Sequence, residues 1–196
     1  MKIETGKDFE RECVLAVSKA ESVHMSRNGV RVSIAKDGEM IRSKSLPDFS
    51  GAIAPIGREF VFDAKKTNSA SFPLNNYRES KSKAKQLKHL LDRSRVGSIT
   101  FFLIHWNERR LKTKTVEAAT IAFPVHFDMS FWIAFDMGEQ KSISLDECKH
   151  FGIDVEWETP ARCRRPRMNL IAAMKEMAEW PLFDCSGSGG ISSSLD

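Results

Sequence analysis

The nine residues from 98 to 106 read Ser-Ile-Thr-Phe-Phe-Leu-Ile-His-Trp and form the most apolar run of the chain. A short run that is apolar on both of its alternating faces is typical of a central strand covered on both sides. Helical periodicity appears before it, over residues 78–91, and after it, from about Asn169 to Trp180. The pattern therefore predicts an α/β fold with a mixed central sheet flanked by helices.

Turn and capping signals indicate the remaining elements. Ser144 to Glu147 is a capping-box pattern that opens a short helix, which Gly152 ends. The turn signals Asn28-Gly29 and Asp37-Gly38 frame a hairpin. We expect His105 to be a packed side chain rather than a ligand. The other expected segments are a helix beginning near Thr5 and Asp8, a strand at 116–123 and an apolar segment at 131–135 that packs nearby.

With 196 residues, 41% of them hydrophobic, the chain is long enough for one domain with its own core. We expect one domain over residues 1–183 and a disordered Ser/Gly-rich tail over 184–196. The N-terminus lacks the apolar run of a signal peptide, and no stretch of 18 apolar residues exists. The four cysteines form no CxxC pair, which argues against a zinc knuckle. We therefore expect a cytoplasmic protein with free thiols and no membrane partner.

A second strand is predicted at residues 59–65, where side chains alternate in character. Phe60 and Phe62 fall on one face, and Asp63 and Lys65 fall on the other. We expect the strand to bury its aromatic face and to present Asp63 and Lys65 together.

Asp48 lies fifteen residues before Asp63, and the glycine- and proline-containing segment 51–57 can turn the chain back between them. Two carboxylates on neighbouring strands can hold a hard cation through oxygen ligands. Lys65 can then orient a water molecule or steady a developing negative charge. This set suits metal-assisted phosphodiester hydrolysis, although a hairpin with solvated charges has the same spacing.

The net charge of +4 is concentrated in local clusters. Residues 75–95 contain seven Lys or Arg against two acidic residues, a local charge of +5. A second cluster lies at 162–167. Such clusters are often only solvated surface, but basic patches are also what phosphate backbones bind. The basic residues that we expect to contact DNA are Lys81, Lys85, Lys88, Arg164, Arg165 and Arg167.

A series of motifs in chain order resembles the RecU family of Holliday junction resolvases, within the PD-(D/E)xK nuclease superfamily with its restriction-endonuclease-like core. The resemblance covers roughly Thr5 to Met177. The matching motifs are Pro47-Asp48-Phe49-Ser50-Gly51, Phe62-Asp63-Ala64-Lys65-Lys66-Thr67, Phe72-Pro73-Leu74, Gln86-Leu87-Lys88-His89-Leu90, Gly97 through Phe102, and Pro166-Arg167-Met168-Asn169.

The resemblance implies a homodimeric endonuclease that depends on Mg²⁺, for which Mn²⁺ can substitute, and that nicks four-way DNA junctions symmetrically. It implies that Asp48 and Asp63 bind the metal. Lys65 would position the attacking water or stabilise the pentavalent phosphate. Gln86 would reach the site from the basic helix, and Glu10 matches an acidic position on the first helix of the wider superfamily.

The sequence departs from the family pattern in four places. Asp63 stands where glutamate is usual, and Leu46 stands where a threonine often supplies a ligand. Extra residues separate Phe72-Pro73-Leu74 from Gln86. The segment before Asp48 looks short for the stalk that family members insert into the junction.

These departures leave two alternatives open. One is another nuclease of the same fold, acting in restriction, repair or flap processing. The other is a non-catalytic DNA-binding accessory module for recombination. A bacterial and a phage origin are equally compatible with the sequence.

Overall fold

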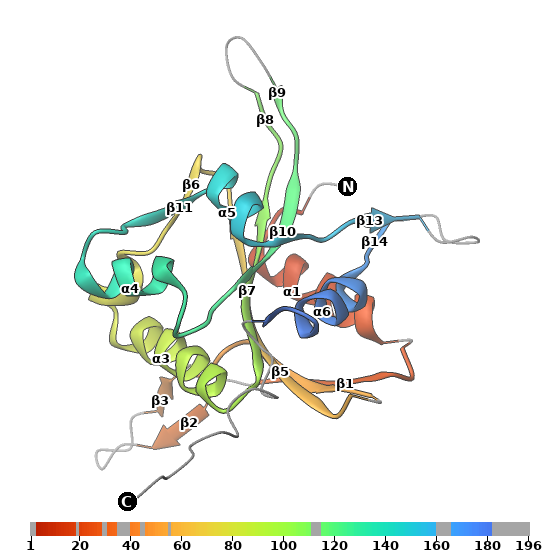
Figure 1. The fold of residues 1–196 in the computed structure, drawn as a ribbon, viewed down its shortest axis with the longest axis horizontal. Helices are drawn as coiled ribbons and strands as arrows, with labels where there is room; N and C mark the ends of the chain where they lie inside the picture. Colours follow the sequence, from red (N-terminus) through yellow and green to blue (C-terminus); the bar gives the residue numbers. More distant parts are fainter. Residues whose placement is uncertain are drawn as a thin grey trace, which may run out of the picture.

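Six strands form the central sheet of the computed structural model (Figure 1). Their spatial order is β1 (Val23–Arg27), β4 (Phe49–Ile53), β5 (Arg58–Thr67), β7 (Ile99–Trp106), β10 (Ala119–Pro124) and β12 (Ile153–Asp154). Strands β5 and β7 are parallel, and the other neighbours are antiparallel. The predicted α/β fold with a mixed sheet is therefore confirmed. The residues that the structure describes are 3–18, 20–28, 31–34, 40–43, 46–54, 56–110, 115–159 and 166–181.

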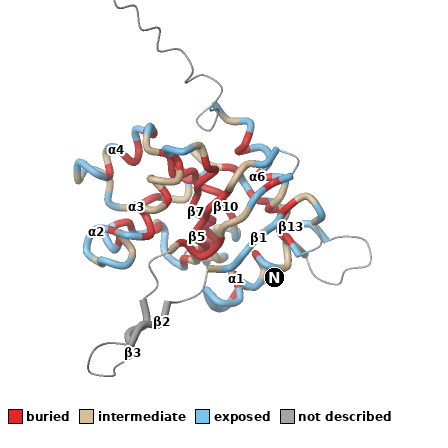
Figure 2. The backbone as a smooth tube through the Cα atoms, turned by 90° about the horizontal axis from the view of Figure 1, so that it is seen from below, coloured by how far each residue is buried: buried red, intermediate tan, exposed pale blue. Residues whose placement is uncertain are grey.

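Helices cover both faces of this sheet (Figures 1 and 2). Helices α1 (Gly6–Val17) and α6 (Leu170–Ala178) pack on one face. Helices α3 (Lys81–Arg95), α4 (Ser130–Met137) and α5 (Leu145–Phe151) pack on the other. Every residue of β7 is buried between the two layers, as its apolar sequence predicts.

Local chemistry accounts for the helix starts that the sequence indicates. Thr5 caps α1, where its hydroxyl accepts from the Asp8 backbone N–H at 3.1 Å and the Asp8 carboxylate accepts from Thr5 in return. Ser144 and Glu147 form the same reciprocal pair at the start of α5. Each box satisfies N–H groups that the first helical turn leaves without partners.

In the described part of the chain, four short pairs of strands lie outside the main sheet. The predicted hairpin is present as β2 and β3, and β8–β9 projects beyond the end of β7 (Figure 1). The pairs are β2 (Arg31–Ile34) with β3 (Met40–Ser43), β6 (Ser71–Pro73) with β11 (Ser142–Ser144), β8 (Arg109–Arg110) with β9 (Thr115–Val116), and β13 (Trp157–Glu158) with β14 (Arg167–Met168).

Several element boundaries differ from the prediction. The helix expected at 78–91 is two helices, α2 (Asn76–Glu79) and α3, because Ser80 has an extended backbone with φ −95° and ψ 117°. The strand expected at 116–123 is divided between β9 and β10, and the apolar segment at 131–135 belongs to helix α4. Strand β1 was not predicted.

Strand β5 buries its aromatic face, as predicted. Val61 and Asp63 on its second face are buried as well, because β5 lies inside the sheet and α3 covers that face. His105 is packed as expected, between the rings of Phe9 and Trp157, with Nδ1 2.8 Å from the Thr120 hydroxyl.

Cys13 and Cys148 are buried free thiols. The helices in the described part of the chain are all too short or too polar to cross a membrane. The expected disordered tail at 184–196 lies outside the described residues.

Candidate active site

Asp48 and Asp63 lie opposite each other where the β4–β5 hairpin ladder ends. The last register pair is Phe49 with Phe62, and Asp48 is one step beyond it. The Asp48 backbone N–H donates to Asp63 Oδ1 at 3.2 Å, and the Ala64 N–H donates to Asp48 Oδ2 at 3.0 Å. The two aspartate side chains thus accept from backbone N–H groups at the end of the β4–β5 ladder, in place of backbone carbonyls. These hydrogen bonds hold both carboxylates together at the end of the hairpin.

Gly51 permits the close strand packing that positions this hairpin. It pairs with Met25 on β1 and Phe60 on β5. A Cβ atom at Gly51 would lie 2.0 Å from the His24 carbonyl oxygen and 2.6 Å from the Phe60 ring. Only glycine fits between β1 and β5 at this position.

Two amide side chains hold the segment that leads into Asp48. Asn28 donates from Nδ2 to the Pro47 carbonyl at 2.9 Å, and its backbone N–H donates to the Asp48 carbonyl at 2.8 Å. From the other side, Gln86 Nε2 donates to the Leu46 carbonyl at 3.1 Å. The structure thus places Gln86 against the segment that leads into Asp48. Sequence reasoning missed Asn28, whose only signal was a turn.

Lys65 supplies the positive charge of the site. Its Nζ lies 2.5 Å from Asp63 Oδ2 and 3.6 Å from Asp48 Oδ2. Burial raises the pKa of Asp63 to about 7, with Lys65 opposing this rise and Asp48 adding to it. Burial acts to lower the pKa of Lys65, but the two carboxylates together raise it. Lys65 therefore keeps its charge.

The donor set fits a Mg²⁺ ion. Asp63 Oδ2 is fully buried and lies against the Lys65 ammonium, so this position already favours a positive charge. Mg²⁺ is usually held by one or two carboxylates, with water and substrate phosphate completing its shell. No group of three or more His, Cys, Asp or Glu side chains that could hold a metal occurs among those residues. The site therefore suits a cation that relies on substrate and water for its remaining ligands.

Glu10 lies on α1, the helix that packs on the opposite face of the sheet from α3. Its carboxylate pairs with Arg27 on β1. Burial, and then the charges of Asp48 and Glu10, raise the pKa of the Cys13 thiol, which lies one turn after Glu10. Helix α1 thus borders the Asp48 side of the site, although Glu10 does not join the two aspartates as a ligand group in the described structure.

The predicted DNA-contacting residues lie on different sides of the sheet. Lys81, Lys85 and Lys88 form an exposed stripe along the outer side of α3, whose inner side carries Gln86. Arg167 lies on the α1 side and donates to the Leu15 carbonyl at 3.2 Å. The other two, Arg164 and Arg165, lie outside the described residues.

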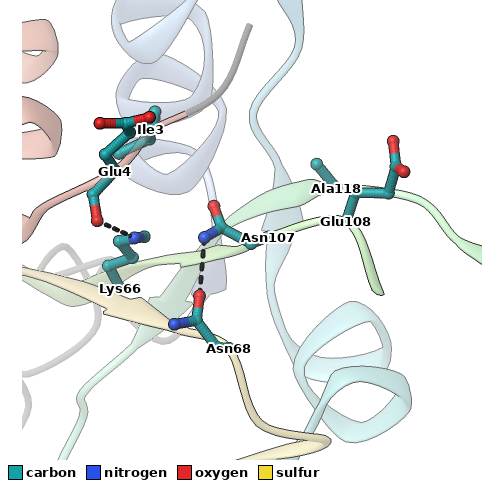
Figure 3. Close-up of a pocket in the computed structure, with 7 residues that line it drawn as sticks. All are labelled: Ile3, Glu4, Lys66, Asn68, Asn107, Glu108 and Ala118. Atoms are coloured by element: carbon teal, nitrogen blue, oxygen red, sulfur yellow. Dashed lines mark hydrogen bonds between the residues drawn. The ribbon is translucent and has the colours of Figure 1, made fainter. Parts of the chain in front are cut away.

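A cavity of about 890 Å³ lies apart from the carboxylates (Figure 3). Lys66 follows Lys65 along β5 and therefore points to the opposite face of the sheet, the α1 face. At the edge of the cavity, the Lys66 ammonium donates to the Glu4 carbonyl at 2.5 Å. Neither aspartate lines it. The lining residues are Ile3, Glu4, Lys66, Asn68, Asn107, Glu108 and Ala118.

Comparison with known proteins agrees with this geometry. The profile of RecU, described as Recombination protein U, matches residues 20–164. The Holliday junction resolvase RecU of Pediococcus pentosaceus is 32% identical over 119 residues, which cover 58% of this chain and 50% of that protein. The chain thus spans about half the length of the curated relative that it matches.

A solved structure, the Holliday junction resolvase Hjc of Archaeoglobus fulgidus, aligns with a TM-score of 0.42 and 16% identity, covering 76% of this chain and 94% of that chain. Values this low say nothing about activity. The family profile, in contrast, spans the β4–β5 hairpin, Lys65 and α3. The predicted family is confirmed: this chain belongs to the RecU family.

Proposed function

We propose that this protein is a Mg²⁺-dependent endonuclease that nicks four-way DNA junctions in opposite strands. The observation that carries the proposal is the buried pair Asp48 and Asp63, with Lys65 Nζ 2.5 Å from Asp63. The relative named a Holliday junction resolvase supports junction DNA as the substrate.

Asp48 and Asp63 would hold the metal ion. Bound Mg²⁺ would supply charge for the phosphate and lower the pKa of a water molecule. Lys65 would keep a positive charge beside the phosphate, where it steadies the charge that develops during attack. Mn²⁺, with similar oxygen ligands, would substitute for Mg²⁺.

Outer residues would keep the centre in position. Gln86 and Asn28 hold the segment before Asp48, so they would orient this ligand without touching the reacting atoms. Glu10 would act from α1, where its carboxylate pairs with Arg27. The single domain at 1–183 would contain all of these groups.

DNA contact would involve the basic stripe of α3, and we propose that Arg164, Arg165 and Arg167 add phosphate contacts. A homodimer would place two active sites on the two equivalent strands of a symmetric junction. Because the substrate is recombining DNA, the place of action would be the cytoplasm of a bacterial or phage-infected cell.

The test is cleavage of a labelled, mobile four-way junction with and without Mg²⁺, using Asp63→Asn as the control. Paired nicks in opposite strands that require both Mg²⁺ and Asp63 are the expected result. Binding without cleavage would favour the accessory module. Undiminished cutting by purified Asp63→Asn would reject the catalytic assignment.

A second candidate is a nuclease of the same chemistry that prefers another DNA form. The hairpin before Asp48 favours it, because β2 and β3 are only four residues each. Linear, nicked and flap duplexes at equal concentration separate the two candidates. A preference for any of these over the junction would keep the nuclease and reject the resolvase.

A further inference from the structure

The hydroxyl group of Tyr77 is buried without a partner. Tyr77 lies on α2, is the only tyrosine of the chain, and is 3% exposed. Its Oη makes no hydrogen bond to any residue that the structure describes. An unsatisfied buried hydroxyl destabilises the folded state, so such groups in native proteins call for a specific explanation.

The Tyr77 ring packs on the residue of β7 that pairs with Asp63. It packs edge-on against Phe102, with ring centroids 5.2 Å apart and an interplanar angle of 63°. Phe102 is the β7 residue directly opposite Asp63, on the face that α3 covers. Burial, then the charges of Asp63 and Asp48, raise the pKa of Tyr77 well above its ordinary value. The phenol therefore remains a protonated donor at working pH.

The carboxylate of Asp63 already has a cationic partner, whereas the phenol has none. Asp63 Oδ2 lies 2.5 Å from Lys65 Nζ, and Tyr77 Oη is a buried donor without a hydrogen bond among the described residues. The charges of Asp63 and Asp48 both act on the phenol, so a phosphate bound at these carboxylates is a suitable acceptor for its hydrogen.

We infer that the Tyr77 hydroxyl donates a hydrogen bond to a non-bridging oxygen of the scissile phosphate. This inference rests on the proposed nuclease function. A neutral donor held in a buried site strengthens its hydrogen bond as negative charge grows on the phosphate, and so favours the transition state over the bound substrate. Tyr77 is then a catalytic residue that the Asp48–Asp63–Lys65 set does not include.

The first test is Tyr77→Phe, which removes only the hydroxyl. Single-turnover cleavage is expected to slow about tenfold or more, the usual effect of a hydrogen bond to a charged group. Tm should stay equal or rise, because an unsatisfied group is removed. Wild-type cleavage by Tyr77→Phe would overturn the inference and leave the nuclease function intact.

Ser94→Ala is the matched control. Ser94 carries a buried hydroxyl on α3 that donates to the Leu91 carbonyl at 2.7 Å and accepts from the Phe127 N–H at 3.3 Å. Its loss should lower Tm without changing the rate. If Ser94→Ala slowed cleavage as much as Tyr77→Phe, a general packing defect would explain both variants and the inference would fail.

Sulfur substitution identifies the atom that Tyr77 contacts. Each non-bridging oxygen at the cleavage site is replaced by sulfur, and wild type and Tyr77→Phe are compared on both diastereomers. For one diastereomer, the rate loss caused by sulfur and the rate loss caused by Tyr77→Phe should combine to less than their product. The reason is that sulfur at the contacted position already weakens the hydrogen bond that Tyr77→Phe removes. If the two rate losses multiplied fully on both diastereomers, the proposed contact between Tyr77 and a phosphate oxygen would be rejected.

A final readout does not require cutting. With one tyrosine in the chain, 3-fluorotyrosine labelling yields one protein ¹⁹F resonance. Addition of junction DNA in Ca²⁺ should shift it, and a resonance that does not move with DNA bound would overturn the inference. Absence of cleavage of any DNA by the wild type would instead reject the proposed function.

Discussion

Gln86 on α3 donates through Nε2 to the carbonyl of Leu46, a residue forty positions earlier, at 3.1 Å. This hydrogen bond joins the basic helix to the segment that enters Asp48. Gln86 is 4% exposed, so no solvent can replace the lost partner if it is removed. A residue on the basic helix α3 thus holds the segment that positions a candidate metal ligand.

Gln86→Ala is expected to weaken Mg²⁺ binding about 10–100-fold, the usual cost of losing an outer-shell partner. Titration of single-turnover cleavage against Mg²⁺ measures this shift. Gln140→Ala, which removes a Gln hydrogen bond to the carbonyl of Ser142 on β11, is the control. If the Mg²⁺ concentration at half-maximal cleavage were the same in Gln86→Ala and wild type, the hydrogen bond to the Leu46 carbonyl would not be needed to position the metal ligand.

Gly51→Ala is expected to destabilise the fold by more than about 2 kcal/mol, because its methyl group has to displace β1 backbone or the Phe60 ring. The measurement is urea unfolding followed by tryptophan fluorescence. Gly6→Ala is the matched control, since nothing lies within 4 Å of its added Cβ. Equal stability of the two variants would contradict the close packing of β1 on β4.

Asp63 should make the metal-free protein less stable as pH rises. Its folded pKa is raised by burial to about 7 from 3.8, so the folded state holds a proton that the unfolded state has released. The resulting stability is fully present below pH 3.8 and is lost as pH rises through 7. Asp63→Asn removes this dependence, so its stability relative to wild type should grow from pH 4 to 8 by at most about 4 kcal/mol.

Urea unfolding in chelator at several pH values measures that difference. Saturating Mg²⁺ should then stabilise wild type at pH 8 and stabilise Asp63→Asn much less, since the variant has lost one of the two proposed ligand carboxylates. A constant difference between the two proteins across the pH range would mean that Asp63 is already ionised in the folded state at pH 4.

Neutralising Lys81, Lys85 and Lys88 to Gln should weaken junction binding and flatten its salt dependence. Each lost phosphate contact lowers the slope of log K against log salt by about 0.9. A salt titration of junction affinity measures the slope. Lys7→Gln with Lys175→Gln, on the helices of the opposite face, is the control pair. A slope unchanged in the triple variant would exclude the outer side of α3 from the DNA interface.

Local sequence determined much of the fold and the central chemistry. The apolar run at 98–106 forms the buried strand β7. The capping boxes that begin at Thr5 and Ser144 start helices α1 and α5, as their sequences predict. The fifteen-residue spacing of Asp48 and Asp63 suited a hairpin that places them opposite each other. These outcomes depend on near neighbours in the chain, which the sequence displays directly.

Tertiary packing decided the rest. Strand β1 pairs with β4 only because Gly51 leaves room for it, and Asn28 reaches Pro47 only through that pairing. Asp63 is buried because α3 closes over the second face of β5. Burial, the pKa of a carboxylate and an unsatisfied hydroxyl all depend on contacts between residues far apart in the chain, which no local pattern records.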